Sequence, residues 1–161
     1  MTQTKATASQ QPEIEISVLV PVMNEAGNIR PLIDEICEAL EGRRFEIIYV
    51  DDASTDGSPA ELADSAAAIP QLRVLRHQSR AGQSAAIRSA LFVARGHLVG
   101  VLDGDGQNVP SDFPALEAAL TAAVPPGSGS VAAQCCLPAV VECSVTPRSA
   151  AARRSCRMHE V

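Results

Sequence analysis

The sequence has no apolar run near the roughly 18–20 residues that a helix needs to cross a bilayer. Its polar start, Met1–Gln11, contains no apolar segment of the kind found in signal peptides. Positive charge is also scarce, since 13 basic and 19 acidic side chains give a net charge of −6. Nucleic-acid binding needs clustered cations, and the first two thirds of the chain contain no such cluster. These absences predict a cytoplasmic protein that binds no nucleic acid, and Cys37, the lone cysteine of that part, agrees with a reducing compartment.

Three common phosphate- and metal-binding motifs are missing as well. The only lysine is Lys5, so the chain has no Gly-Lys-Ser/Thr phosphate loop. The dinucleotide fingerprint Gly-x-Gly-x-x-Gly does not follow the first predicted strand. The loop that starts at Asp103 is not an EF-hand, because Asn108 and Pro114 stand where that loop requires glycine and glutamate.

What the sequence does contain is an alternation of strand and helix patterns, in a length of 161 residues that suits one domain. Apolar, β-branched runs predict strands at 14–22, 45–50, 72–76 and 97–102. Apolar residues spaced three and four apart predict helices at 29–40, 58–69 and 82–95, and a last helix from Asp112 to about Ala123. This order predicts an α/β fold: a three-layer, Rossmann-like parallel sheet joined by right-handed crossovers.

Acidic and amide side chains follow three of these strands. They are Asn24 and Glu25, Asp51 and Asp52, and Asp103 and Asp105. Each pair alone is also explained as a turn or a helix cap. Ligands of parallel sheets, however, bind beyond the carboxyl ends of the strands. The convergence of all three pairs on that edge therefore predicts a binding site there.

The segment Asp103–Asn108 carries oxygen ligands at alternate positions in a loop with two glycines. Hard cations such as Mg²⁺ and Mn²⁺ prefer carboxylate and amide oxygens, and Mg²⁺ often takes only one or two carboxylates beside substrate phosphates. The alternative interpretation is an ordinary Asp-Gly turn. From the residues alone, both interpretations stay open.

Three segments resemble the nucleotide-sugar glycosyltransferases of the GT-A fold. They are Ser17–Glu25, Val50–Gly57 and Leu102–Gln107. More narrowly, Asp-x-Asp-x-Gln followed by Pro110 and Pro114, together with Arg80-Ala81-Gly82, resembles the polyprenyl-phosphate (dolichyl-phosphate) sugar transferases. The resemblance covers about residues 14–120. It implies the nucleotide-binding half of a GT-A fold and an inverting sugar transfer from a nucleoside-diphosphate donor to a polyprenyl phosphate or another acceptor, peripheral to a membrane.

The resemblance also implies roles for individual residues. Pro21, Asn24 and Glu25 would line the nucleotide pocket, Asp51 and Asp52 would hold the base, Asp103 would lie near the ribose and diphosphate, and Arg80 would contact phosphate. Asp105 is the main candidate ligand of Mg²⁺ or Mn²⁺, with Asp103 and Gln107 as further candidates. No residue matches the family's acceptor-side base, since Glu142 and Glu160 lie in no supporting pattern.

A change of composition separates residues 124–161 from the rest. Residues 1–124 carry nine basic and 17 acidic side chains, whereas residues 125–161 carry four and two. The last segment also holds four cysteines, Cys135, Cys136, Cys143 and Cys156. Their spacing contains no Cys-x-x-Cys pair, so a metal-binding segment is the weaker interpretation. The other is an irregular tail that does not belong to the preceding fold, as after a frameshift or truncation.

The predicted organisation is therefore a disordered segment 1–13, a nucleotide-sugar-binding domain 14–123 and an irregular tail 124–161. The leading hypothesis is a truncated glycosyltransferase domain. A non-catalytic nucleotide-sugar-binding module and an inactive remnant are the alternatives.

Overall fold

The computed structural model describes residues 13–123, 139–142 and 157–158. The strands are β1 (Ile16–Val22), β2 (Phe45–Asp51), β3 (Leu72–Arg76), β4 (Leu98–Val101), β5 (Ala139–Glu142) and β6 (Arg157–Met158). The helices are α1 (Ile29–Ala39), α2 (Ser58–Ala68), α3 (Gln83–Leu91) and α4 (Phe113–Ala123), with a short 3₁₀ turn at Pro110–Asp112. Within these described residues, no helix is long and apolar enough to span a membrane.

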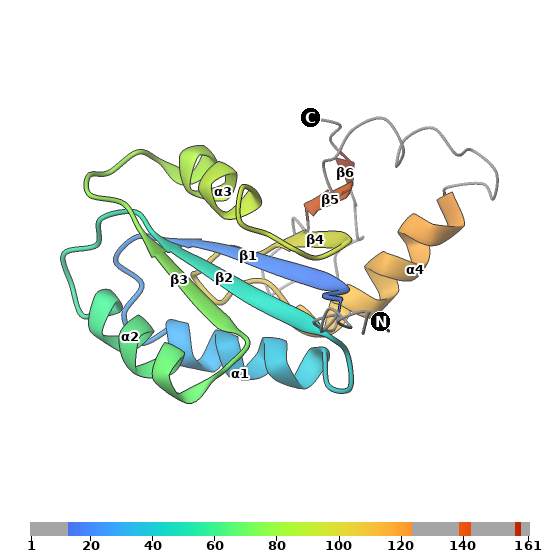
Figure 1. The fold of residues 1–161 in the computed structure, drawn as a ribbon, viewed down its shortest axis with the longest axis horizontal. Helices are drawn as coiled ribbons and strands as arrows, with labels where there is room; N and C mark the ends of the chain where they lie inside the picture. Colours follow the sequence, from blue (N-terminus) through green and yellow to red (C-terminus); the bar gives the residue numbers. More distant parts are fainter. Residues whose placement is uncertain (1–12, 124–138, 143–156, 159–161) are drawn as a thin grey trace, which may run out of the picture.

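The strands form one sheet in the order β3-β2-β1-β4-β5-β6. All neighbouring pairs are parallel except β5 and β6, which are antiparallel. Helices α1 and α2 cover one face of the sheet and α3 lies on the other (Figure 1). The three-layer parallel α/β arrangement predicted from the sequence is confirmed.

Successive residues of the buried strands pack on opposite faces, as the pleat requires. In β1, Val18 and Val20 pack with α1 and α2, whereas Leu19 packs with α3. The first cluster also contains the four apolar residues that α1 turns toward the sheet: Ile29, Leu32, Ile33 and Ile36. Burial on both faces explains why these strands read as continuous apolar runs and not as alternating ones.

Strand β5 and its neighbour β6 fall within residues 124–161, where no regular element was predicted. β5 pairs in parallel with β4 from Leu98 to Val101, so the backbone of β4 supplies hydrogen-bonding partners that no local sequence pattern reveals. The four cysteines of this segment and Glu160 lie outside the described residues.

The third helix is shorter than predicted, because it ends at Leu91 and not at Arg95. A buried carboxylate accounts for the difference. The backbone N–H of Arg95 donates to Glu46 Oε1 at 2.7 Å, and its guanidinium donates to Glu46 Oε2 from Nε at 3.1 Å and from Nη2 at 2.8 Å. These bonds draw Arg95 out of the helical path and down onto the sheet.

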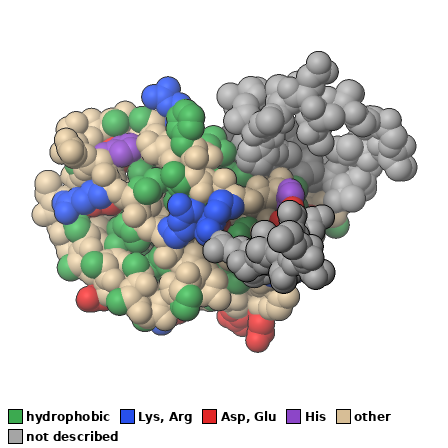
Figure 2. All heavy atoms as spheres, in the orientation of Figure 1, with side chains coloured by type: hydrophobic (Ala, Val, Ile, Leu, Met, Phe, Trp, Pro, Cys, Tyr) green, Lys and Arg blue, Asp and Glu red, His purple; other side chains and the backbone are tan. Residues whose placement is uncertain are grey.

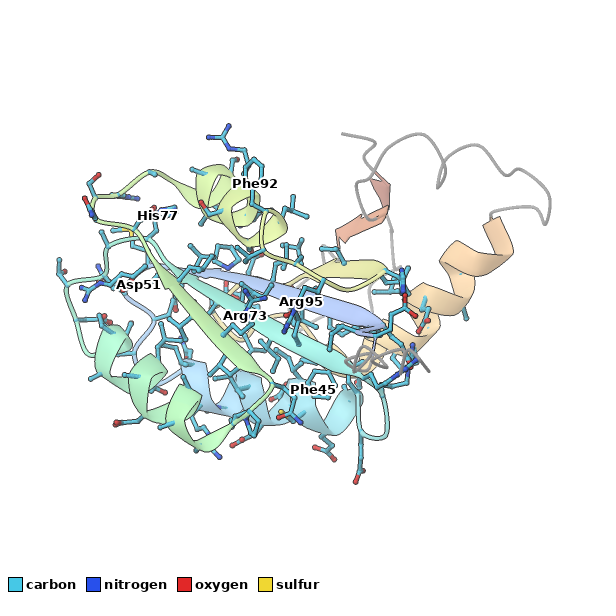
Figure 3. All side chains as sticks on the ribbon, viewed as in Figure 1. Phe45, Asp51, Arg73, His77, Phe92 and Arg95 are labelled. Carbon is cyan, nitrogen blue, oxygen red and sulfur yellow. The ribbon has the colours of Figure 1, made fainter. Side chains whose placement is uncertain are left out.

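Glu46 itself lies on β2 with a side chain that is 2% exposed. It also accepts hydrogen bonds from Ser17 Oγ at 2.8 Å and from Arg73 Nη1 at 2.9 Å. Figure 3 shows Arg73 and Arg95 close together over the sheet. In the same region of this face, Figure 2 shows a group of basic side chains, although the protein as a whole is acidic. Although burial raises the pKa of Glu46, the bonds from Arg95, Arg73 and Ser17 outweigh it, so the pKa is lowered.

We expect Glu46→Gln to lower the free energy of unfolding at neutral pH by about 2 kcal/mol, because two partly exposed guanidinium groups lose their buried partner. A carboxylate whose folded-state pKa is lowered stabilises the fold above its unfolded pKa, and this contribution is lost as pH falls through the folded value. The difference between the variant and the parent should therefore shrink below about pH 4. Urea unfolding, followed by circular dichroism at a series of pH values, measures this difference in the free energy of unfolding.

The matched control is Glu38→Gln, because Glu38 is an exposed side chain on α1. Its effect should stay within about 0.5 kcal/mol at every pH. Equal effects of the two substitutions would show that Glu46 does not hold the connection between α3 and β4.

Candidate functional site

A pocket of about 350 Å³ opens at the carboxyl ends of β1, β2 and β4. Its lining comprises Pro21, Val22, Met23, Glu25, Asp52, Arg80, Gly82, Gln83, Asp103, Gly104 and Asp105. Six of these are among the residues singled out from the sequence: Pro21, Glu25, Asp52, Arg80, Asp103 and Asp105. The parallel register brings them together, since Val22 on β1 pairs with Asp51 on β2, and Leu102 just after β4 donates its N–H to Leu19.

The loop between β1 and α1 is fixed by hydrogen bonds to the β2–α2 loop and to the first residue of α2. The N–H of Asn24 donates to Ser54 Oγ at 3.0 Å, and the N–H of Glu25 donates to Ser58 Oγ at 2.9 Å. Asn24 adopts a φ of 59° and accepts the N–H of Thr55 on its Oδ1 at 2.8 Å. These reciprocal bonds set the position from which Glu25 reaches the pocket.

Two carboxylates occupy the N-terminal end of α1. Asp56 Oδ2 accepts the N–H of Ala26 at 3.1 Å, and the two oxygens of Glu61 accept the N–H groups of Gly27 and Arg30 at 2.7 and 3.0 Å. The pKa of Asp56 is lowered, chiefly by its hydrogen bonds to Ser58. A helix N-terminus is an anion site only while its N–H groups are free. Here the protein's own carboxylates accept the N–H groups of Ala26, Gly27 and Arg30, and their negative charge makes this end of α1 a poor phosphate site.

The carboxylate of Asp52 organises the opposite wall of the pocket. Its Oδ1 accepts the N–H of Ala81 at 2.8 Å, and its Oδ2 accepts the N–H of Gly82 at 2.7 Å. Gly82 has a φ of +92°, a conformation that favours glycine, and it begins α3. The turn thereby places Arg80 at the pocket.

Burial raises the pKa of Asp52, but the hydrogen bonds from Ala81, His77 and Gly82 outweigh it, so the pKa is lowered overall. Asp52 is therefore an anion at neutral pH. With Glu25, Asp103 and Asp105 it gives the pocket lining four carboxylates against a single guanidinium, that of Arg80.

The loop after β4 presents its oxygen atoms outward. Asp103, Asp105 and Gln107 are all exposed, whereas Gly104 between them is buried. Asp103 Oδ1 accepts a hydrogen bond from Gln83 Nε2 at 2.7 Å, and Asp105 Oδ1 accepts the N–H of Gln107 at 3.0 Å. Gly104 packs so closely on β1 that an added Cβ would lie 2.4 Å from Val22 Cγ1 and 3.2 Å from the carbonyl oxygen of Pro21.

The described residues contain no cluster of three or more histidine, cysteine, aspartate or glutamate side chains that forms a metal cage. An open pair of carboxylates still suits a hard cation that keeps most of its ligands for water and phosphate. Asp103 and Asp105 line the same pocket and offer that chemistry, and Gln107 adds a neutral oxygen on the same loop. The residues present therefore fit Mg²⁺ or Mn²⁺.

Three of the predicted site residues do not line the pocket: Asn24, Asp51 and Gln107. Asp51 is 1% exposed and closes the turn after β2, where its Oδ1 accepts the N–H of Ser54 at 2.8 Å. Its Oδ2 lies 3.1 Å from Arg76 Nε. Direct contact of these three residues with a ligand stays a prediction, and the structure gives Asn24 and Asp51 roles in shaping the loops.

The sequence pattern did not indicate Met23, Gln83 or His77 as site residues. Met23 stands between two predicted site residues, so its place in the loop was a usable signal. Gln83 directly follows the glycine that starts α3, and its contact with Asp103 spans 20 residues of chain. His77 bonds to Asp52 across 25 residues, and no local pattern indicates such a contact.

Comparisons with known proteins agree with one another. The family model of glycosyl transferase family 2 matches residues 17–124. A dodecaprenyl-phosphate galacturonate synthase from Rhizobium johnstonii is 36% identical over 109 residues, which cover 64% of this chain and 31% of that protein. A dolichol-phosphate mannosyltransferase from Pyrococcus furiosus is 32% identical over 103 residues, which cover 64% of this chain and 29% of that one. The chain thus spans about a third of the length of these curated relatives.

Solved structures show the same fold. A mannosyltransferase from Pyrobaculum calidifontis, solved in complex with GDP-Man and Mn²⁺, superposes with a TM-score of 0.53 at 32% identity, over 58% of this chain and 28% of that one. The S. aureus protein TarS superposes with a TM-score of 0.57 at 24% identity, over 68% of this chain and 33% of that one, and supports the fold alone.

We expect Gly104→Ala to destabilise the protein by about 1–3 kcal/mol, because the new methyl group overlaps the rigid, buried side chain of Val22. The matched control is Gly57→Ala, whose Cβ would meet only Ala26 Cβ at an ordinary 3.5 Å. Thermal and urea unfolding measure both variants.

The double variant Val22→Ala/Gly104→Ala identifies the cause. Removing the opposing methyl groups of Val22 should relieve the overlap. The double variant should then be destabilised by less than the sum of the two single variants. Strict additivity would show that the contact with Val22 does not require a glycine at position 104.

Proposed function

Because the chain belongs to glycosyl transferase family 2, we propose that its pocket binds the nucleoside-diphosphate part of a sugar donor together with a divalent cation. The sugar then passes to a polyprenyl phosphate or another acceptor. The observation that carries this proposal is the meeting of three strand ends around one pocket with four carboxylates and one arginine.

The charge of the pocket supports the cation. A diphosphate is itself an anion, and Coulomb repulsion from Glu25, Asp52, Asp103 and Asp105 opposes its entry. Arg80, the one guanidinium in the described lining of the pocket, does not balance this charge, and the N–H groups of Gly27 and Arg30 at the start of α1 already donate to Glu61. A divalent cation bound by the carboxylates would offset much of this negative charge and would supply a local positive charge for the diphosphate.

Asp105 and Asp103 would hold this cation, with Gln107 as a further oxygen ligand. When bound, Mg²⁺ or Mn²⁺ acts as a Lewis acid that stabilises the charge on the departing nucleoside diphosphate. The Pyrobaculum calidifontis relative, solved with GDP-Man and Mn²⁺, supports this kind of donor and metal.

The remaining pocket residues would position the nucleotide. Asp52 accepts donor groups of the base, Pro21 and Glu25 form the wall beside it, and Arg80 pairs with phosphate, where its planar guanidinium suits two oxygens. Asn24 and Asp51 serve mainly by fixing the loops that carry these groups, through their bonds to Thr55 and Ser54.

The acceptor side of the proposal comes from the relatives. Dodecaprenyl phosphate and dolichol phosphate appear in the names of the proteins cited above, so a polyprenyl phosphate at a membrane surface is the acceptor we propose. We also propose that the protein acts in the cytoplasm, peripheral to a membrane. Inversion at the sugar carbon is part of the same proposal, and no described residue is assigned as the acceptor's base.

The test is calorimetric titration of the full chain with UDP, GDP and dTDP, each with and without Mn²⁺. We expect one of them to bind in the presence of Mn²⁺, and Asp105→Ala to weaken that binding at least tenfold (about 1.4 kcal/mol). Without metal, the parent and the variant should behave alike. The matched control is Asp64→Asn on the exposed side of α2, which should bind as the parent does.

Transfer of a radiolabelled sugar to a polyprenyl phosphate then separates enzyme from binding module. Product formation that Asp105→Ala abolishes supports the transferase. Metal-dependent binding without product would favour a nucleotide-sugar-binding module, and absence of binding by all three nucleotides would reject both.

A further inference from the structure

A histidine outside the lining of this pocket, His77, connects Asp52 to the last turn of α3. Its Nδ1 lies 2.7 Å from Asp52 Oδ1, and its Nε2 lies 2.9 Å from Ser89 Oγ. The ring follows directly after β3, where the N–H of His77 donates to the carbonyl oxygen of Asp51 at 2.9 Å. Figure 3 shows His77 at this end of the sheet, on the side of α3.

Asp52 fixes the position of one proton on the ring. A carboxylate only accepts hydrogen bonds, so Nδ1 carries the proton that Asp52 receives. In the neutral ring Nε2 is then an acceptor, and the hydroxyl of Ser89 donates to it. With 18% of its side chain exposed, His77 is held from both sides in one orientation.

Asp52 is thereby tied to α3 twice. The first tie is direct, through the N–H groups of Ala81 and Gly82 at the start of the helix. The second runs through His77 to Ser89, further along the helix. Oδ1 of Asp52 takes part in both ties, so a displaced ring would also disturb the bond to Ala81 and, with it, the turn that carries Arg80.

The order hydroxyl, imidazole, carboxylate is also that of a serine nucleophile and its base. A nucleophile needs free N–H donors nearby to stabilise an oxyanion. Ser89 lies inside α3, where backbone N–H groups are used within the helix, and it does not line the pocket. The geometry therefore favours support of Asp52 over covalent chemistry at Ser89.

We propose that His77 is a positioning residue for nucleotide binding, which acts by orienting the carboxylate of Asp52 toward the pocket and by holding the Arg80 turn in place. This inference rests on the proposed function, because it assigns a second residue to the same nucleotide site. Ser89 supports the ring and contributes less, since its loss leaves the bond between His77 and Asp52 intact.

Two substitutions of His77 separate hydrogen bonding from packing. In His77→Asn, the side-chain amide stands where Nδ1 stands and keeps a donor for Asp52. In His77→Gln, the amide reaches the position of Nε2 and keeps a partner for Ser89 but not for Asp52. The affinity of each variant is measured by calorimetric titration in the presence of Mn²⁺. The ligand is the nucleoside diphosphate that the parent binds: UDP, GDP or dTDP.

We expect His77→Gln to weaken nucleotide binding about tenfold, as for the loss of a hydrogen bond to a charged group, and His77→Asn to stay within about threefold of the parent. The matched control is Gln78→Ala, an exposed neighbour that should bind as the parent does. Melting temperatures identify folded variants, so that the affinities of folded proteins are compared.

The outcomes are distinct. Weaker binding by His77→Gln with rescue by His77→Asn supports the proposal. Unchanged binding by both variants, or better binding by His77→Gln than by His77→Asn, overturns it and assigns His77 to packing. If the parent binds no nucleoside diphosphate, the proposed function fails first and the role of His77 fails with it.

Discussion

The parallel register of β1, β2 and β4 is the constraint on which the site depends. Val22 pairs with Asp51, and the strand path continues past each end, because Asp52 donates its N–H to Val22 and Leu102 donates its N–H to Leu19. Residues that follow these strands must therefore lie side by side, whatever their distance in the chain. A shift of one residue in either pairing would turn Asp52 or Asp103 away from the pocket. The buried apolar faces of the strands oppose such a shift, so the core fixes the site.

The polar residues at the strand ends have two different roles: some hold the loops in place, and others line the pocket. Ser54, Asp56, Ser58 and Glu61 direct their oxygens to backbone N–H groups of the β1–α1 loop and of α1. Asp51 is likewise used within its own turn. Of the acidic residues at the end of β2, only Asp52 reaches the pocket. The segment Val50–Gly57 is thus largely a scaffold that presents one carboxylate.

The sequence predicted the strands and helices well where they are buried on a regular pattern. β1, β2 and β3 and the starts of α1 and α2 fall within two residues of their predicted bounds. Prediction failed where a distant side chain decides the local structure. Hydrogen bonds between Arg95 and Glu46 accompany the early end of α3. Strand β5 forms where its residues pair with β4. The same limit applies to the site, because its acidic residues follow strands and are visible in sequence, whereas His77 and Gln83 are placed by contacts across 25 and 20 residues.

The use of helix ends suggests why the proposed nucleotide pocket needs neither a glycine-rich fingerprint nor a lysine. In dinucleotide-binding folds, the first helix after β1 receives the pyrophosphate on its free N–H groups. In this chain Asp56 and Glu61 accept N–H groups at that helix end, and their negative charge opposes the binding of an anion there. In the proposed function, the charge of a bound diphosphate is met elsewhere, by Arg80 and by a cation at Asp103 and Asp105. An acidic pocket is consequently consistent with an anionic ligand, since its carboxylates select the cation that the diphosphate requires.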